Sequence, residues 1–536
     1  MTERWPTRRS LLAAGLATAA AALPARAHAA AAVVPSSRTK AVRTPLPSGP
    51  IYDVTKFGAK TDGKTLATAA IQAAIDECGR RGGGTVILPP GEYVSAPLFL
   101  RDNVGLHLFA GARLTATADK ELYPPIDGRA GGVERQVYAS LITGVGVSNV
   151  AISGRGTLDG NGLVWMQAHV ANAALRAKLG LIPRGEGMAT HPPGSPLRYP
   201  RPRLINLVRC QGVSISEIAL ERTPAWTIHL VYCTDIDITG VRINGYDKGQ
   251  GTSGIVLDSC KDARLSSCHL SAGDDGIALK AGYDEDGRRV GIDCSDVVIQ
   301  NCTFLDSAGA GIALGSETAA GIRNVTVTNC VFDNVAWAFR IKSNRGRGGG
   351  IESVRLSGLI IHRSRTAAFE ITGFHDPGLP VAPPIGTPTF RNIVCSDFVV
   401  SDAPKLGAIH GLPERWVESV VLKDLLVHEA RSGLVCENVK GLSIENLTIA
   451  PDAGPAVALK NVSDVEIRRL RVGKTNSNAA IVLDGAHDVL VASCKAPPDL
   501  KVFLALEGAG SDGIVLVDNV VPSAALQPAR GIVVKR

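Results

Sequence analysis

Two kinds of short apolar segment alternate along one stretch of the chain, Gly254-Ile-Val-Leu257, Asp262-Ala-Arg-Leu265, Gly276-Ile-Ala-Leu279, Asp296-Val-Val-Ile299 and Gly311-Ile-Ala-Leu314. One kind begins with Asp, Asn or a small residue, and the other begins with Gly or Ala. Apolar and β-branched residues at every second position are typical of short strands. Because the two kinds alternate at a nearly constant period, each turn of the chain adds one strand to each of several parallel sheets. This stretch therefore predicts a solenoid.

The same repeat extends outward in both directions, from Asn149-Val-Ala-Ile152 to Asp488-Val-Leu-Val491, mostly at intervals of 22 to 33 residues. A propeller or a sandwich would need regular antiparallel hairpins, whose two-residue turns are not a regular feature here. We therefore predict an all-β parallel β-helix. Thr68–Cys78 has helical spacing and is followed by glycines, so we expect a short N-terminal helix that caps the first coil.

The N-terminus resembles an export signal. Arg8 and Arg9 precede an Ala-rich apolar run that is too short to span a membrane, and small residues follow to Ala29. We predict a twin-arginine-type signal peptide at 1–29, a flexible linker at 30–50 and one β-helix catalytic domain at 51–536. Without residues 1–29 the chain has 53 basic and 49 acidic residues, a net charge of +4, which does not indicate a nucleic-acid partner.

The chain has 11 cysteines, and three of them recur at the same place in successive repeats, at Cys268, Cys302 and Cys330. Stacked buried thiols explain this recurrence better than disulfides do. No CxxC pair or nearby His cluster indicates zinc, so we predict no metal site. The stretch from Gly162 to Pro202 is rich in Pro, Gly and Arg, and we expect a surface loop there that walls a substrate groove.

The chain resembles glycoside hydrolase family 28, the polygalacturonases and their relatives, over nearly all of the segment that follows the signal. The segments that carry the resemblance include Phe57–Gly63, Gly156–Gly160, Arg201-Pro202, Thr223–His229, Gly273-Asp-Asp275, Asp286–Val290, Arg340-Ile-Lys342 and Gly411–Glu414. The resemblance implies a right-handed parallel β-helix that hydrolyses α-linked galacturonate-containing pectic polysaccharide.

By this resemblance, Asp274 is the general acid and Asp275 activates water, while Arg340 and Lys342 bind a sugar carboxylate. Inverting hydrolysis needs such a pair of carboxyl groups on opposite sides of the scissile bond. Asp274 and Asp275 beside Gly273 also fit a turn cap, and Arg340 and Lys342 also fit a solvated basic face.

Two family positions are altered. The family motif Asn-Thr-Asp reads Gly-Thr-Ser253 here, and Gly-His-Gly reads Gly309-Ala310-Gly311. Val256 also replaces an Asp that frequently follows the first motif. A serine hydroxyl is too weak a base to replace a carboxylate, so we consider Glu370 and Asp376 as substitutes for the carboxylate and His375 as a substitute for the missing family His.

The sequence thus predicts an exported, polygalacturonase-like glycosidase that needs no cofactor and acts as a monomer in the periplasm or outside the cell. Its partner is pectic polysaccharide, with no nucleic acid and no membrane span. Three alternatives stay open: a rhamnogalacturonan-type hydrolase with an altered site, a catalytically inactive pectin-binding β-helix, and a polysaccharide lyase. Lyases of this kind often use calcium, and Asp284-Glu-Asp286 is the one acidic segment to consider, although a loop facing water is the simpler interpretation.

Overall fold

The computed structural model describes residues 49–181, 191–245, 251–375, 384–508, 510–522 and 532–535, all within one compact unit, Thr44–Arg536. The predicted signal peptide and all but the last two residues of the predicted linker lie outside these ranges, so both stay predictions. Within the described ranges, no helix has the length and apolar character that a membrane crossing requires.

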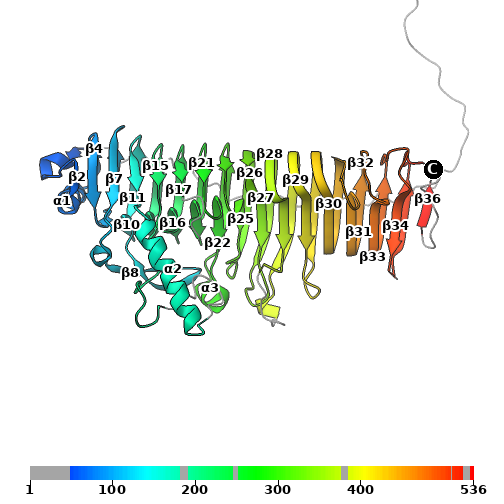
Figure 1. Cartoon of the computed structure of the whole chain (residues 1–536), viewed down its shortest axis with the longest axis horizontal. Helices are drawn as coiled ribbons and strands as arrows, with labels where there is room; N and C mark the ends of the chain where they lie inside the picture. The colour runs from blue at the N-terminus through cyan, green and yellow to red at the C-terminus, as the bar shows by residue number, and fades with distance from the viewer. Residues whose placement is uncertain are drawn as a thin grey trace, which may run out of the picture. The chain divides into compact units, whose positions relative to one another are not determined.

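Parallel strands stack coil upon coil through this unit, which confirms the right-handed parallel β-helix (Figure 1). Strands of one face pair in register with those of the next coil, as Leu257 with Leu279 and Leu279 with Leu314. The strands of the first coils are β1 (Ile51–Asp53), β2 (Asp62–Leu66), β3 (Gly84–Leu88), β4 (Gly91–Ser95), β5 (Leu98–Phe99), β6 (Val104–Leu108), β7 (Ala112–Ala116), β10 (Ile142–Val145), β11 (Ser148–Gly154) and β12 (Thr157–Asp159).

The middle coils hold β13 (Ile205–Val208), β14 (Gln211–Ser216), β15 (Ala219–Glu221), β16 (Ile228–Val231), β17 (Thr234–Thr239), β18 (Arg242–Asn244), β19 (Ile255–Asp258), β20 (Lys261–Ser266), β21 (His269–Ser271), β22 (Ile277–Lys280), β23 (Cys294–Gln300), β24 (Thr303–Leu305) and β25 (Ala310–Leu314). Several of the later strands are longer and turn a corner, as β28 shows by pairing with both β26 and β27. The later strands are β26 (Ile322–Asp333), β27 (Val335–Lys342), β28 (Gly350–Thr372), β29 (Thr389–His410), β30 (Val417–Ile449), β31 (Val457–Arg468), β32 (Arg471–Val472), β33 (Ala479–Ala492), β34 (Val502–Glu507), β35 (Asp512–Val517) and β36 (Ile532–Lys535).

The residue that introduces each repeat has a left-handed backbone, which explains why Asn, Asp and Gly recur there. Asp235, Asp262, Asp296 and Asn324 all have φ between 53 and 60°. Asn and Asp tolerate this conformation better than other residues with a side chain. Asn324 also donates from Nδ2 to Asp296 Oδ1 of the preceding coil at 2.9 Å. Asn and Asp therefore recur in the repeat because the backbone at this position has a positive φ.

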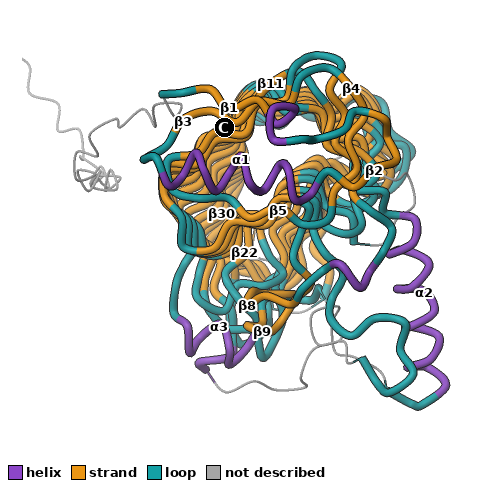
Figure 2. The backbone as a smooth tube through the Cα atoms, turned by 90° about the vertical axis from the view of Figure 1, so that its left-hand side faces the viewer, coloured by secondary structure: helices purple, strands orange, loops and turns teal. Residues whose placement is uncertain are grey.

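The first coil is covered by α1 (Thr68–Arg80), as predicted, and the helix extends two residues beyond the expected end. Its buried face is formed by Ile71, Ala74, Ile75 and Cys78. Figure 2 shows α1 lying across the open end of the coils. The helix thereby shields edge strands that would otherwise expose unpaired backbone groups.

The prediction of a loop over Gly162–Pro202 is wrong in its first half, where α2 (Leu163–Lys178) forms. Leu163–Lys178 contains no Gly or Pro and is rich in Ala, so it has good helix propensity. Apart from Gly162, which precedes the helix, the Gly and Pro residues of the stretch lie after it. A small separate core anchors the helix, in which the Trp165 ring packs edge-on against Tyr123 and Tyr138 at centroid distances of 4.9 and 5.1 Å.

A short hairpin beside α2 is fastened to the sheet by a buried ion pair. The hairpin consists of β8 (Pro125–Ala130) and β9 (Val133–Tyr138), the antiparallel pair among the described strands that stands apart from the coils. Arg129 donates to Asp258 Oδ1 at 3.0 Å, and both side chains are fully buried. His229 Nε2 lies 3.6 Å from the other Asp258 oxygen, and burial lowers the pKa of His229 to about 4. His229 is therefore a structural residue.

All eleven cysteines are buried and unpaired, which confirms the stacked thiols. Cys268 and Cys302 sit at equivalent places in successive coils, and their Sγ atoms contact backbone carbonyls. Cys268, Cys302 and Cys330 belong to the large hydrophobic core of the coils, so the thiols act as small core residues.

We expect none of the eleven thiols to react with a thiol-specific chromogenic reagent within minutes in the folded protein, because each is buried. In denaturant all eleven should react, and the absorbance of the released chromophore counts them. Fewer than eleven reactive thiols after unfolding without reductant would show a disulfide and contradict the structure.

Candidate active site

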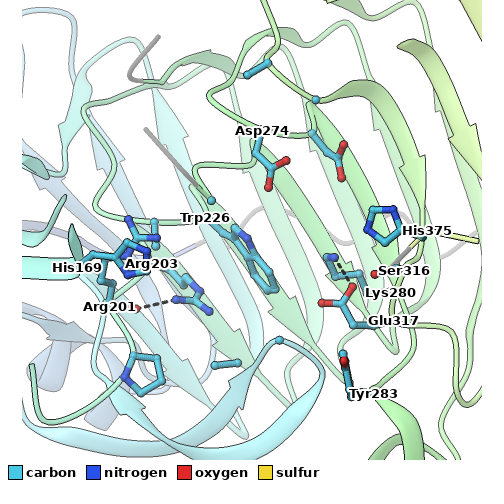
Figure 3. A pocket seen from close by; sticks show the side chains of 18 of the residues that line it. His169, Arg201, Arg203, Trp226, Asp274, Lys280, Tyr283, Ser316, Glu317 and His375 are labelled. Atoms are coloured by element: carbon cyan, nitrogen blue, oxygen red, sulfur yellow. Dashed lines mark hydrogen bonds and ion pairs between the residues drawn. The ribbon is translucent and has the colours of Figure 1, made fainter. Parts of the chain in front are cut away.

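A cavity of about 430 Å³ lies above the outward face of the middle coils, where β22, β25 and β27 meet the walls made by α2 and the hairpin. Asp274, Asp275, Arg340, Lys342 and His375 all line it, so the structure brings most of the predicted site residues together. Figure 3 shows Asp274 and His375 on one side of Trp226, with Lys280 and Glu317 below them. Asp376 lies outside the described residues, and it stays a prediction.

Asp274 and Asp275 occupy the turn between β21 and β22, so the backbone bend turns both carboxyl groups toward the same cavity. Asp275 is buried and accepts two hydrogen bonds, from the Ala310 backbone N–H and from Lys342 Nζ, both at 2.9 Å. A Cβ atom at Gly309 would come within 2.6 Å of Asp275 Oδ1, so glycine is needed for the carboxylate to fit. Burial alone would raise the pKa of Asp275, but the Lys342 ammonium outweighs it and lowers that pKa.

Asp274 has a different environment from its neighbour. It is partly exposed, and the hydroxyl of Ser253 donates to Asp274 Oδ2 at 3.1 Å. Ser253 itself is 1% exposed. Ser253, at the position where the resemblance implies a carboxylate, therefore contacts the predicted acid directly and supplies a neutral partner.

The other altered positions lie together in an apolar layer beneath the cavity. Val256 and Ala310 are fully buried, and they pack with Ala278 and Ala313 against Trp226. Trp337 covers the same cluster from the side. The side chains at the two altered positions thus support the indole rings and are not exposed to a ligand, and Trp226 has mainly the packing role expected for it.

The two predicted carboxylate-binding residues have partners of their own. They share a face of β27, as the alternation of the strand predicts. Lys342 pairs with Asp275, whereas Arg340 donates to Glu370 Oε2 at 2.5 Å and lies 4.2 Å above the Trp337 ring. Glu370 is therefore engaged by Arg340, and it does not line the cavity.

His375 lines the cavity next to the basic side chains of β27. Burial together with the charges of Lys342 and Arg340 lowers the pKa of His375 to about 3. A histidine with this pKa is neutral at the pH of ordinary solutions, so it can accept or donate a hydrogen bond without carrying charge.

The sequence analysis did not identify Lys280 and Glu317, which form a buried ion pair at 2.5 Å on the cavity wall. The Lys280 ammonium is the main influence that lowers the pKa of Glu317 to about 2, although burial opposes it. Strand alternation from Ala278 places Lys280 on the outward face, a signal that was available. Glu317 lies in an irregular loop, and its approach to Lys280 depends on the three-dimensional structure.

Among the side chains that the structure describes, no three His, Cys, Asp or Glu residues gather in a way that would hold a metal ion. The acidic segment that we considered for calcium belongs to a helix, α3 (Asp284–Val290), and is not a water-facing loop. Asp284 pairs with the buried Arg347 at 2.8 Å, and Asp286 with Arg289 at 2.7 Å.

The protein consists of parallel coils with an acidic pair above their outward face. This architecture places it in the class of pectin lyase-like β-helix proteins. Comparison with known proteins narrows this class. The family model described as "Glycosyl hydrolases family 28" matches residues 196–369, and one described as "Rhamnogalacturonase A/epimerase, pectate lyase-like" matches residues 51–112.

Several curated relatives and solved structures that match the chain are described as polygalacturonases. A protein of Vitis vinifera described as a probable polygalacturonase is 29% identical over 416 residues, which cover 74% of this chain and 80% of that protein. An endo-polygalacturonase of Pectobacterium carotovorum is 27% identical over 56% of this chain and 70% of its own. The crystal structure of an exopolygalacturonase from Thermotoga maritima superposes with a TM-score of 0.62 at 25% identity, over 77% of this chain and 91% of that one. The chain is thus similar to glycoside hydrolase family 28 over residues 196–369, and to polygalacturonases over most of its length.

Replacement of Lys342 by Met should lower the free energy of unfolding by about 3–5 kcal/mol near pH 7, because it leaves Asp275 buried and unpaired. The pKa of Asp275 is lowered in the folded protein, so the pair stabilises the fold above the ordinary pKa of 3.8 and ceases to do so as the pH falls through the lower folded value. The difference between the parent and Lys342→Met should shrink as the pH falls from neutral toward about 4, because without the ammonium burial raises the pKa of Asp275 in the variant, which then takes up a proton in this range.

Denaturant unfolding of both proteins across this pH range measures the difference. Lys460→Met is the matched control, because Lys460 and Glu437 form an exposed pair whose loss should cost less than about 1 kcal/mol. Equal losses for the two variants, or a difference independent of pH, would contradict the assigned role of Lys342.

Proposed function

We propose that this protein hydrolyses galacturonate-containing pectic polysaccharide, with Asp274 as the general acid and Asp275 as the base. The observation that carries the proposal is that two adjacent carboxyl groups reach one cavity with partners of different charge. Asp275 accepts from an ammonium and Asp274 from a hydroxyl. Carboxyl pairs whose surroundings differ in this way can divide the acid and base roles.

The proposed reaction begins with a proton on Asp274, which the negative charge of Asp275 favours on one member of the pair. Asp274 gives this proton to the glycosidic oxygen as the bond to the anomeric carbon breaks. Asp275, held ionised by Lys342, takes a proton from a water molecule whose oxygen forms the new bond to that carbon. The products are two sugar chains, with the added water divided between them.

The basic residues of the cavity support an acidic substrate. Lys280, Arg340 and Lys342 all line the site, and Trp337 offers a partly exposed ring beside them. Lys342 cannot act only as a carboxylate clamp, because it also holds Asp275. Arg340 is engaged by Glu370 on one side and presents its guanidinium to the cavity as well.

Two alternatives rest on the altered positions. Ser253 cannot replace a carboxylate as a base, which favours a pectin-binding protein without turnover if Asp275 alone is insufficient. A rhamnogalacturonan-type substrate is the second alternative, because Val256 and Ala310 change the layer that supports Trp226 beneath the cavity. Export through a signal at residues 1–29 and action as a monomer complete the proposal.

Replacement of Asp274 by Asn should reduce the rate of reducing-end formation from polygalacturonate by about 100-fold or more, because the amide keeps the shape but has no acidic proton. Asp452→Asn, at an exposed Asp far along the chain, is the control that should retain the parent rate. Undiminished turnover by Asp274→Asn would exclude Asp274 as the acid. Binding of polygalacturonate without turnover by the parent would favour the binding protein, and unsaturated products would favour a lyase.

Replacement of Ser253 by Asp tests whether the site has merely lost a base or has adapted to a different substrate. We expect no gain on polygalacturonate and an upward shift of the pH optimum, because a buried carboxylate 3.1 Å from Asp274 would repel its charge. Ser253→Asn is the matched uncharged control, which should leave the pH optimum in place. A large gain in the pH–rate profile of Ser253→Asp alone would show that only the base was missing.

A further inference from the structure

The helix α2 buries polar side chains on the face that it turns toward the coils. Its buried positions are Trp165, Ala168, Asn172 and Arg176, spaced three or four residues apart and so on one face. The first two pack in the small aromatic core. The last two line the cavity instead. A helix that packed only to cover the coils would carry apolar residues there, so the change from apolar to polar along this stripe indicates a polar occupant.

Arg176 is the least compensated of these side chains. It is only 7% exposed, and among the described residues its Nε and Nη1 atoms have no hydrogen-bond partner. Leaving a charged group buried without partners is costly. A bound anion would remove this cost, because a guanidinium offers two parallel donors to one carboxylate.

Further basic residues surround the same part of the cavity. His169, His191, Arg201 and Arg203 line it together with Arg176, and we call these five residues the basic cluster. Figure 3 shows His169, Arg201 and Arg203 gathered on one side of Trp226, with His375, Lys280 and Glu317 on the other side. Burial is the main cause that lowers the pKa of His191 to about 4, and the nearby Arg135, Arg176 and His169 lower it further, so this imidazole is neutral near pH 7.

Trp226 lies next to the basic cluster and to Lys280. The Arg203 guanidinium lies 4.6 Å from the centre of the Trp226 ring, and Lys280 Nζ lies 5.2 Å from it. Arg201 is fixed by a hydrogen bond from Nη1 to the Pro224 carbonyl at 2.9 Å. Within the cavity of about 430 Å³, Trp226 therefore has Arg203 of the basic cluster at one side of its ring and Lys280, which is paired with Glu317, nearby.

We propose that the basic cluster is a second carboxylate-binding site, in which Arg176 binds the carboxylate of a uronate residue adjoining the sugar that occupies the catalytic region. This inference rests on the proposed function, since it assumes an acidic sugar chain. It assigns to α2 the recognition of a second acidic sugar, so that a dimer of uronate units is bound through both carboxylates and a single uronate through one.

The test measures binding of galacturonate and digalacturonate by isothermal titration calorimetry, in an Asp274→Asn background so that the ligand stays intact. We expect Arg176→Gln to weaken the binding of digalacturonate by about 10- to 100-fold and that of galacturonate by less than about twofold. Lys178→Gln, on the exposed side of the same helix, is the matched control and should change neither affinity.

Arg176→Lys provides a second variant, which keeps the charge but loses the paired donors, and its expected loss for digalacturonate is about three- to tenfold. Thermal unfolding of each variant reports whether the fold is intact. If Arg176→Gln does not fold, the digalacturonate affinity of Arg176→Lys alone decides the test. Unchanged digalacturonate affinity, equal losses for both ligands, or no uronate binding by the Asp274→Asn background would overturn the second site. The proposed function is judged separately, by reducing-end formation from polygalacturonate with Asp274 intact.

Discussion

The in-register stacking of parallel strands is the constraint on which the rest of this protein depends. Each coil repeats the path of the one before, so every outward position of one strand lies above the same position of its neighbour. One such row runs through β16, β19, β22, β25, β27 and β28 as His229, Val256, Ala278, Ala313, Arg340 and Glu370. The row passes from apolar to charged within two coils, and the candidate active site lies at this change.

The electrostatics of the site follow from unequal burial. Asp275 and Lys342 are both nearly excluded from water, so neither charge is acceptable without the other. Lys280 and Glu317 repeat this arrangement on the cavity wall. Asp274 stands at the partly exposed edge, beside a hydroxyl. Asp274 and Asp275 are adjacent in the chain, but their hydrogen-bond partners come from different coils and differ in charge, so the two carboxyl groups differ in environment.

The sequence was sufficient to predict the coils, the capping helix and the stacked thiols, because each leaves a periodic signal. Asn or Asp at the start of a repeat and alternating apolar residues report local backbone requirements, and these recur often enough to be recognised. The meeting of Asp274, Asp275 and Lys342 was expected from resemblance, but the pairing of Lys342 with Asp275 was not, because it depends on which of several facing groups a side chain reaches. Arg176 and α2 were missed because Pro and Gly residues after Lys178 dominated the composition of the whole stretch. The contact of Glu317 with Lys280 bridges a loop and a strand 37 residues apart and has no periodic trace.

The small aromatic core under α2 has a consequence for how this site can change. The helix leaves the coils after β12 and the chain returns to them at β13, while Trp165, Tyr123 and Tyr138 hold it in place by contacts that belong to the outgrowth and not to the stacked interior. Substitutions along its inward stripe, or a change in its length, would thus reshape one side of the cavity and leave the strand ladder intact. The outgrowth can change while the coils stay the same, so the preference of the protein for one acidic polymer over another can diverge faster than its fold.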